Sequence, residues 1–381
     1  MRRYNLIPVF YYHSVAPFRN KEWYKSFLTF NLSHFEDLLK YLVTRKYKFL
    51  NLDEYFYIRT DPSAKGKRMV CLTFDDGYLD NYVYVWPLLK KYNAKGTIFV
   101  SPAFVQENQG VRATLEDVWS GRTGEKDLIS SGFVSWQEME IMIRSGVMDI
   151  QSHSYTHTMY YSDDIIRDFH NPCSDWLYPI GNLFPERLPY YITDKQFREL
   201  IPYGTPFFTQ QSSLICKRVF INDDFTGECA ELLKGIDWKR YNFQECMDRV
   251  SGLYQYYRAG GKLFKSKESH REYLERIRGE IAGSKQLIES KLKKKISHIC
   301  WPHGDYNDLC HKIAIESGYL SSHIVLKAGE TNSFPDRFDR TGSSMIACSR
   351  PLSLLKAVYK LESYRQAKPY IWIRKIYELS R

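Results

Sequence analysis

Short apolar runs alternate along the chain with longer segments whose apolar residues recur every three or four positions. The short runs predict buried β-strands, and the periodic segments predict amphipathic helices. Strands are predicted at residues 7–12, 68–74, 97–100, 147–152, 297–301 and 319–326, and helices at 33–46, 79–92, 136–144, 272–294, 308–317 and 352–364, with a further helix after Pro369. Repeated strand–helix units predict an α/β fold in which helices cover a parallel sheet that is either open or closed into a barrel.

Two stretches interrupt this alternation. Residues 106–132 are polar and rich in Gly and Ser, which indicates an excursion from the sheet. Residues 157–262 are rich in proline and aromatic side chains, and we interpret them as a lobe inserted between two core strands. Its aromatic residues either line a substrate cleft or form a core of the lobe itself, and the core is the favoured interpretation. We therefore predict a barrel over residues 1–349, an inserted lobe at about 158–262 and a basic helical tail at 350–381.

The composition is typical of a folded globular protein. Of 381 residues, 44% are hydrophobic and 26% are charged. The apolar runs are much shorter than the roughly 18 residues of a membrane span. The arginines at the start and the short apolar run after them, which contains Pro8, are typical of a first strand rather than a signal peptide. From this, and from eight cysteines without a C-x-x-C pair, we expect reduced thiols and a cytoplasmic location.

The formal net charge of +10 raises the question of an anionic partner. Residues 262–295 hold 11 Lys/Arg against 5 Asp/Glu and residues 350–381 hold 8 against 2, so each segment has a net charge of +6 and the remainder sums to −2. The sequence contains no nucleic-acid-binding module that we can identify, and we predict no nucleic-acid partner. The tail mixes aromatic residues with Lys and Arg, as a peripheral membrane helix does, but a helix packed across the barrel bottom is the favoured interpretation.

Four of the apolar runs end in polar residues that are suited to catalysis. These ends are His13, Asp75-Asp76-Gly77, the segment from His153 to His157, and Pro302-His303-Gly304-Asp305. In a parallel α/β fold the carboxyl ends of the strands share one face, which is where α/β barrels place their active sites. Taken singly, each motif has a structural explanation as a turn or a pair of exposed histidines. Their joint occurrence at equivalent positions favours an active site.

The residue types at these ends suit one divalent metal ion. A carboxylate and two neutral imidazoles bind zinc, cobalt, nickel or iron, and three protein ligands leave a position open, which is the pattern of a catalytic site. The adjacent carboxylates of Asp75 and Asp76 permit two roles, in which one binds the metal and the other acts as a general base. Gly77 suits a tight turn in which a side chain would crowd the site.

These segments resemble a known family. Thr73-Phe74-Asp75-Asp76-Gly77 is similar to the first motif of the polysaccharide deacetylases, the NodB-homology or carbohydrate esterase family 4 enzymes, and His153-Ser154-Tyr155-Thr156-His157 is similar to their second motif. Trp301-Pro302-His303-Gly304-Asp305 resembles a further segment of many members. The run from Pro8 to Val15 resembles the first strand of the subgroup whose last motif is circularly permuted.

The resemblance implies a distorted (β/α) barrel of about seven strands and metal-dependent removal of N-acetyl groups from amino sugars. It implies that Asp76, His153 and His157 bind the metal, with zinc as the first expectation, and that Asp75 is the general base. Pro302 and a backbone N–H near His303 are expected to contact the substrate and its oxyanion. The implied substrate is a glycan, a lipid-linked sugar or a nucleotide-linked sugar in surface polysaccharide biosynthesis.

The chain departs from the family pattern in two places. The usual C-terminal motif that supplies the general acid is not evident, so we predict His13 in this role, as in permuted relatives, with His323 as the weaker alternative. The arginine-bearing third motif is also missing, and Arg340 is either a residue that pairs with Asp75 and lowers its pKa or a surface arginine. Two other functions stay open: a non-catalytic glycan-binding protein on the same fold, and a hydrolase of non-sugar amides.

Overall fold

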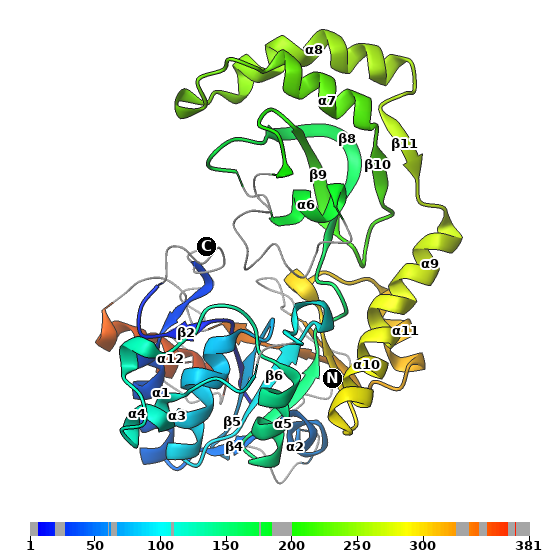
Figure 1. The fold of residues 1–381 in the computed structure, drawn as a ribbon. Helices are drawn as coiled ribbons and strands as arrows, with labels where there is room; N and C mark the ends of the chain where they lie inside the picture. The colour runs from blue at the N-terminus through cyan, green and yellow to red at the C-terminus, as the bar shows by residue number, and fades with distance from the viewer. Residues whose placement is uncertain are drawn as a thin grey trace. The chain divides into compact units, whose positions relative to one another are not determined.

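The structure is a computed structural model that describes residues 7–19, 27–59, 61, 67–107, 110–174, 177–184, 200–324, 335–342, 349–364 and 370. The chain divides into two compact units. Figure 1 labels the helices and strands of both units. The first, which we call the barrel unit, comprises Met1–Ser154, Ser284–Gly304 and Ala314–Arg381. The second, which we call the lobe, comprises Tyr155–Gly283 and Asp305–Ile313.

The core of the barrel unit is a parallel sheet that almost closes on itself. Its strands follow the order β14-β13-β12-β7-β6-β5-β1-β15, and β4 pairs with β5 as a ninth strand outside this path. The strands are β1 (Val9–Tyr12), β4 (Lys48–Leu50), β5 (Met69–Phe74), β6 (Gly96–Val100), β7 (Met148–Ser152), β12 (His298–Cys300), β13 (Ser321–Ile324), β14 (Arg337–Asp339) and β15 (Thr341–Gly342). The two ends of the path, β14 and β15, are separated in the chain only by Arg340, so the eight parallel strands form a nearly closed barrel.

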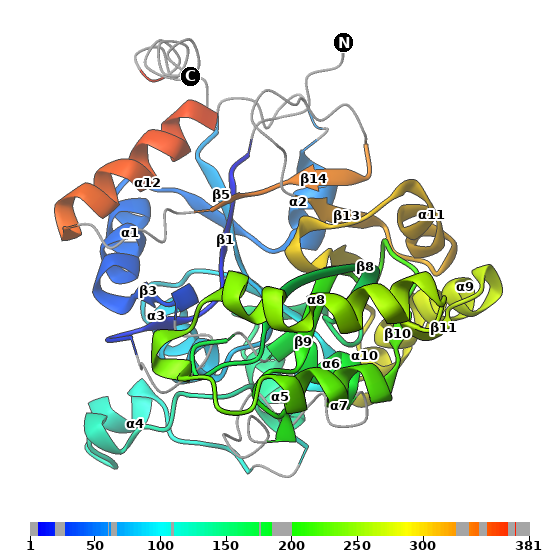
Figure 2. The same cartoon turned by 90° about the horizontal axis from the view of Figure 1, so that it is seen from above.

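Helices surround this barrel in Figure 2, where α1 and α12 lie side by side. The helices of the barrel unit are α1 (Leu32–Thr44), α2 (Leu52–Ile58), η3 (Asn81–Val85), α3 (Trp86–Lys91), η4 (Pro102–Phe104), α4 (Leu115–Trp119), η5 (Glu125–Asp127), α5 (Trp136–Arg144), α10 (Ser284–Leu292), η10 (Pro302–Gly304) and α12 (Arg350–Tyr364), while α11 (Asp308–Glu316) belongs partly to each unit. A two-residue parallel ladder joins β2 (Val15–Ala16) to β3 (Phe30–Asn31). Within the described part of the chain, every helix is too short or too polar to cross a membrane.

The predicted α/β barrel is confirmed, with eight strands instead of about seven. Every residue of β5 is buried, as expected of a central parallel strand that is covered on both faces. The single helix predicted at 272–294 is instead α9 (His270–Arg278), a π-helical turn (Gly279–Gly283) and α10. The elements β4 and α2 were not predicted. Half of the basic tail lies outside the described residues, and with it all of the helix expected after Pro369 except Tyr370.

The lobe is built from two antiparallel strand pairs and several helices. Strand β8 (Met159–Phe169) pairs with β9 (Pro206–Ser212), and β10 (Val219–Ile221) pairs with β11 (Phe264–Lys267). Its helices are α6 (Leu177–Leu183), α7 (Asp223–Leu232), η8 (Trp238–Arg240), α8 (Phe243–Ala259), α9 (His270–Arg278) and η9 (Gly279–Gly283). Phe169, Phe208 and Phe225 are buried in one hydrophobic cluster, so many of the lobe's aromatic residues form a core of their own.

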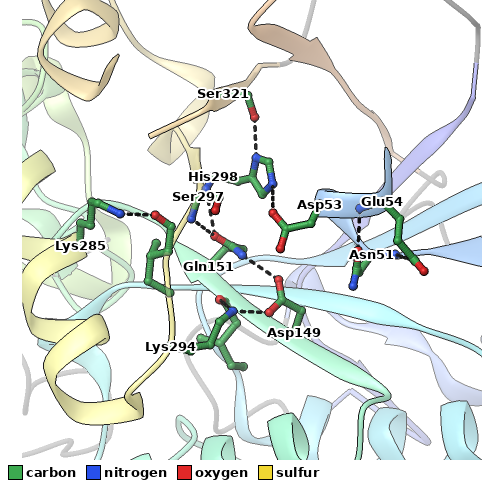
Figure 3. Close-up of polar contacts among 12 residues, drawn as sticks. Asn51, Asp53, Glu54, Asp149, Gln151, Lys285, Lys294, Ser297, His298 and Ser321 are labelled. Atoms are coloured by element: carbon green, nitrogen blue, oxygen red, sulfur yellow. Dashed lines mark hydrogen bonds and ion pairs between the residues drawn. The ribbon is translucent and has the colours of Figure 1, made fainter. Parts of the chain in front are cut away.

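Side chains complete the barrel where β7 and β12 meet (Figure 3). These strands pair at one position, Ile299 with Ser152. The buried Gln151 extends the contact, because its Oε1 atom accepts hydrogen bonds of 2.9 Å from the backbone N–H groups of both Ser297 and His298. Its Nε2 atom donates to Asp149, which pairs with Lys294. A side-chain amide therefore satisfies backbone groups that a neighbouring strand normally satisfies.

We predict that Gln151→Leu destabilises the protein by about 2–5 kcal/mol, because it leaves two buried N–H groups without an acceptor. Urea denaturation of the full chain measures this change. Gln137→Leu is the matched control, since Gln137 is exposed on α5, and its effect is expected within about 0.5 kcal/mol. Equal stability of the two variants would contradict the proposed bridging role.

Candidate active site

The candidate residues of the barrel unit lie at the carboxyl ends of its parallel strands. His13 follows β1, Asp75 and Asp76 follow β5, and His153 follows β7. Cys300 ends β12, and Arg340 joins β14 to β15. Because all these strands are parallel, the barrel brings to one end residues that are up to 327 positions apart in the chain, from His13 to Arg340.

Asp75 and Arg340 form a buried bidentate ion pair. Arg340 Nη1 lies 2.7 Å from Asp75 Oδ1, Nη2 lies 2.8 Å from Oδ2, and both side chains are at most 4% exposed. Burial by itself raises the pKa of Asp75, but the Arg340 guanidinium, assisted by nearby histidines, outweighs burial and holds the pKa below its usual range. The carboxylate is therefore kept ionised, which is the state that a general base requires.

Two further contacts fix the Arg340 guanidinium. Nη2 donates to Cys300 Sγ at 2.7 Å, and Nη1 donates to Thr73 Oγ1 at 3.2 Å. The guanidinium carbon also lies 5.0 Å from the centroid of the Tyr11 ring, within cation–π distance. The planar donor set of arginine suits this arrangement, which the single ammonium group of a lysine does not reproduce.

Asp76, His153 and His157 offer ligand atoms that all lie within 4.8 Å of one another. His153 Nε2 lies 3.3 Å from Asp76 Oδ1, while His153 Nδ1 lies 3.0 Å from the carbonyl oxygen of Cys300. A metal-binding histidine commonly donates its other ring N–H to such a carbonyl, which fixes the ring and its tautomer. One carboxylate and two imidazoles fit a divalent ion of the zinc type.

A second group, formed by Asp75, His153 and Cys300, also lies within ligand distance. Here both carboxylate oxygens of Asp75 and the sulfur of Cys300 already accept hydrogen bonds from Arg340. A cation at this position would compete with the guanidinium, so the group containing Asp76 and His157 fits a metal better.

The turns that carry these residues have left-handed backbone conformations. The φ angles of Asp76, Ser154 and His157 are 70°, 61° and 52°. Such conformations are uncommon for residues other than glycine, and they concentrate at functional sites. Gly77 has a φ of 75°, and a Cβ atom at this position would lie 3.1 Å from Val100 Cγ1, which agrees with the tight turn predicted there.

The turn between the two histidines is held by Glu280 of the lobe. Its Oε2 atom accepts hydrogen bonds from the backbone N–H groups of Tyr155 and Thr156, at 3.1 and 2.9 Å. Its other oxygen accepts from the Thr156 hydroxyl. Burial raises the pKa of Glu280 despite these hydrogen bonds.

His13, the predicted general acid, is half-buried at the end of β1. Its carbonyl oxygen accepts from Asn81 Nδ2 at 3.0 Å, and Ser14 Oγ, in the next residue, donates to Asp80 Oδ2 at 2.5 Å. Burial lowers the pKa of His13, against the opposing effect of the Asp76 and Asp75 carboxylates. A lowered pKa makes the imidazolium a stronger acid and also reduces its population near neutral pH.

His323, the alternative acid, lies inside the barrel on β13. Its ring is fully buried and contacts the rings of Phe99, His298 and Phe338. Neither ring nitrogen has a hydrogen-bond partner among the described residues, and burial holds its pKa well below the usual range. A neutral, enclosed imidazole is poorly placed to protonate a substrate, so the structure favours His13.

The predicted substrate-contacting segment follows β12. Pro302 is buried, and His303 is exposed with a left-handed φ of 58°. The turn closes through a 3.0 Å hydrogen bond from Gly304 N–H to the Trp301 carbonyl oxygen.

Sequence reasoning missed four residues that support the site. Asp80 and Asn81 anchor the end of β1, Glu280 holds the histidine turn, and Cys300 contacts Arg340. Cys300 lies in an apolar run, so its pattern indicates only a core residue.

Comparisons with known proteins agree with this geometry. Residues 63–181 match the family described as polysaccharide deacetylase. YxkH of Bacillus subtilis (strain 168), assigned by name to the polysaccharide deacetylases, is 34% identical over 94 residues, which cover 25% of this chain and 31% of that protein. The poly-beta-1,6-N-acetyl-D-glucosamine N-deacetylase of Staphylococcus aureus (strain MRSA252) is 29% identical over 133 residues, which cover 34% of this chain and 37% of that protein.

The chain therefore spans about a third of the length of the curated relatives it matches. Among solved structures, a de-N-acetylase from Aggregatibacter actinomycetemcomitans superposes with a TM-score of 0.50 at 17% identity, covering 88% of this chain and 93% of that one. At this identity the likeness supports the fold alone. The predicted resemblance to the polysaccharide deacetylases is therefore confirmed over residues 63–181, which hold the first and second motifs.

We predict that Asp76→Ala and His153→Ala each abolish binding of one divalent ion per chain, because each removes one of three ligands. Zinc titration with a chromophoric chelator as competitor, followed by metal analysis of the dialysed protein, measures the stoichiometry and the affinity. Cys300→Ser is the matched control, because Cys300 belongs only to the less suitable group and is expected to leave the stoichiometry unchanged. Loss of zinc in Cys300→Ser with retention in Asp76→Ala would contradict the assignment.

We predict that Arg340→Met moves the acidic limb of the pH profile of kcat/KM to higher pH. The variant removes the cation that lowers the pKa of Asp75 and leaves burial, which raises it, so the base becomes protonated at a higher pH. Below neutral pH the rate is expected to fall by roughly tenfold or more. Arg340→Lys keeps a cation, so its acidic limb is expected to lie between those of the parent protein and Arg340→Met. An unchanged acidic limb in Arg340→Met would contradict the role of the ion pair.

Proposed function

We propose that this protein hydrolyses N-acetyl groups on amino-sugar units of a surface polysaccharide or its precursor, in a reaction that depends on one divalent metal ion. The proposal rests on one observation, namely that an ionised Asp75 lies beside a possible metal-ligand set. Asp75 forms a bidentate ion pair with Arg340. The ligand set consists of Asp76, His153 and His157. This arrangement combines a base with a site suited to a Lewis-acid metal ion, a combination that can hydrolyse an amide. The acetylated amino sugar as substrate class rests on the family match over residues 63–181 and on the name of the staphylococcal relative.

Each residue of the candidate active site has a separate role in the proposed hydrolysis. A divalent ion held by Asp76, His153 and His157 would supply Lewis-acid polarisation and lower the pKa of a water molecule. Asp75 accepts the proton of the attacking water, and its ion pair with Arg340 keeps it deprotonated before each turnover. The backbone N–H in the turn near His303 donates to the developing oxyanion.

His13 completes the cycle as the general acid. Protonation of the leaving amine is needed because an amide anion is a very poor leaving group. The carboxylates of Asp76 and Asp75 act to raise the pKa of His13, whereas burial lowers it and makes the protonated imidazole a stronger acid. Asn81 and Asp80 hold the end of β1 and so fix the position of His13.

The intact ligand and base set also bears on the alternative functions. A non-catalytic glycan-binding protein has no need of a buried carboxylate–guanidinium pair, which removes two charges from water at a cost. We therefore place the protein among the enzymes. The distinction between sugar and non-sugar amides rests on the substrate test below.

We predict that Asp75→Asn lowers the rate of acetate release from oligomers of N-acetylglucosamine by at least about a hundredfold, because the amide cannot accept the proton. Enzymatic quantification of acetate, in the presence of zinc, measures the rate. Asp237→Asn is the control, since Asp237 is exposed in the lobe. Equal rates in Asp75→Asn and the parent protein, or release of acetate only from non-sugar amides, would refute the proposal.

A further inference from the structure

The barrel unit contains a cavity of about 180 Å³ that the proposed chemistry does not use. Its polar wall consists of hydroxyl and carboxyl groups from Ser14, Thr29, Asp80, Ser130 and Ser131. Drug-sized ligands occupy roughly 300–1,000 Å³, so this cavity suits a smaller molecule.

A connected row of hydrogen-bonding groups lies along the polar wall. Thr29 Oγ1 lies 2.9 Å from Ser14 Oγ, which donates to the buried carboxyl group of Asp80. The β2–β3 ladder fixes this geometry, because Phe30 N–H donates to the Ser14 carbonyl oxygen at 2.8 Å. Hydroxyl groups both donate and accept, so this wall matches a ligand whose edge carries several hydroxyl groups.

Apolar side chains line the same cavity. Phe18 and Ile129 contribute to its lining, and these side chains are 68% and 63% exposed. A large apolar side chain that remains this exposed is available to a ligand. A pyranose ring combines hydroxyl groups around its edge with an apolar C–H face, and this combination matches a hydroxyl-lined wall beside an aromatic ring.

The described lining includes no lysine or arginine. Phosphate groups are bound in proteins mainly by such cations and by backbone N–H groups. The Asp80 carboxyl group offers no positive charge to a diphosphate. The cavity therefore suits a neutral sugar better than the diphosphate of a nucleotide-linked sugar.

The cavity shares two chain segments with the candidate active site. Ser14 directly follows His13, and Asp80 lies four residues after Asp76. Asn81, next to Asp80, donates to the His13 carbonyl oxygen. A sugar in this cavity would thus lie at the same end of the barrel as the residues assigned to hydrolysis.

We propose that the cavity lined by Ser14, Phe18, Thr29 and Asp80 is a subsite for one neutral pyranose unit of a glycan chain, next to the unit whose acetamide is hydrolysed. This proposal rests on the proposed function and narrows its substrate to an oligosaccharide rather than a nucleotide-linked monosaccharide.

The test measures binding separately from turnover. Affinities for a tetramer of N-acetylglucosamine, for the monosaccharide and for its uridine diphosphate derivative are measured by calorimetry in the full chain carrying Asp75→Asn, with zinc present. In this background, Phe18→Ala and Thr29→Val are each expected to weaken tetramer binding roughly three- to tenfold. Phe18→Trp is expected to restore it.

Tyr57→Ala is the matched control, because Tyr57 is an aromatic residue of the barrel unit that is 69% exposed on α2, away from the cavity lining. It is expected to leave tetramer affinity unchanged. The exposure of Phe18 means that its replacement leaves the core intact, and thermal unfolding verifies this.

Unchanged tetramer affinity in Phe18→Ala and Thr29→Val would overturn the subsite, as would a parent affinity no higher for the tetramer than for the monosaccharide. A stronger effect of these variants on the uridine diphosphate sugar than on the tetramer would also overturn it. The proposed function fails by a different result, namely continued acetate release in Asp75→Asn, so the two failures are distinguishable.

Discussion

The ion pair between Asp75 and Arg340 is the interaction on which the candidate site depends. It joins the Asp75-Asp76 motif, at the end of β5, to the single residue that lies between β14 and β15. Removing either partner leaves the other as an uncompensated buried charge, which is far costlier than the pair itself. The charge state of the proposed base and the closure of the barrel are therefore linked through one side chain.

Cys300 connects this ion pair to the metal-ligand set. Its sulfur accepts a hydrogen bond from Arg340, and its carbonyl oxygen lies 3.0 Å from His153 Nδ1. The base and one metal ligand are thus oriented by the same residue. The small side chain of Cys300 leaves room for the guanidinium of Arg340, which lies 2.7 Å from the sulfur.

The sequence predicted the barrel and most of its elements because their signals are local. The six buried residues of β5 and the amphipathic period of α5 are read directly from the order of residues. Asp75, Asp76, His153 and His157 were identified by short motifs at strand ends. The base role of Asp75, the ligand roles of the last three and the acid role of His13 remain predictions.

Long-range partners were harder to predict because they follow from barrel closure. The pairing of Arg340 with Asp75 spans 265 positions, and only one of two open interpretations anticipated it. Gln151 substitutes for a strand ladder and Glu280 holds a turn 124 residues away, so neither has a local signature. Helix boundaries also differ from the prediction: the helix predicted from residue 33 begins at Leu32, because the Asn31 side chain caps it by accepting a hydrogen bond from the Ser33 backbone N–H.

The left-handed backbone at Asp76, Ser154 and His157 restricts which residues this site tolerates, independently of chemistry. Aspartate and histidine enter this conformation more readily than most residues, whereas β-branched side chains are strongly disfavoured. Ser154 has the same constraint without belonging to the ligand set. Natural variation at Ser154 would therefore record the shape of the loop alone, separate from selection for metal binding.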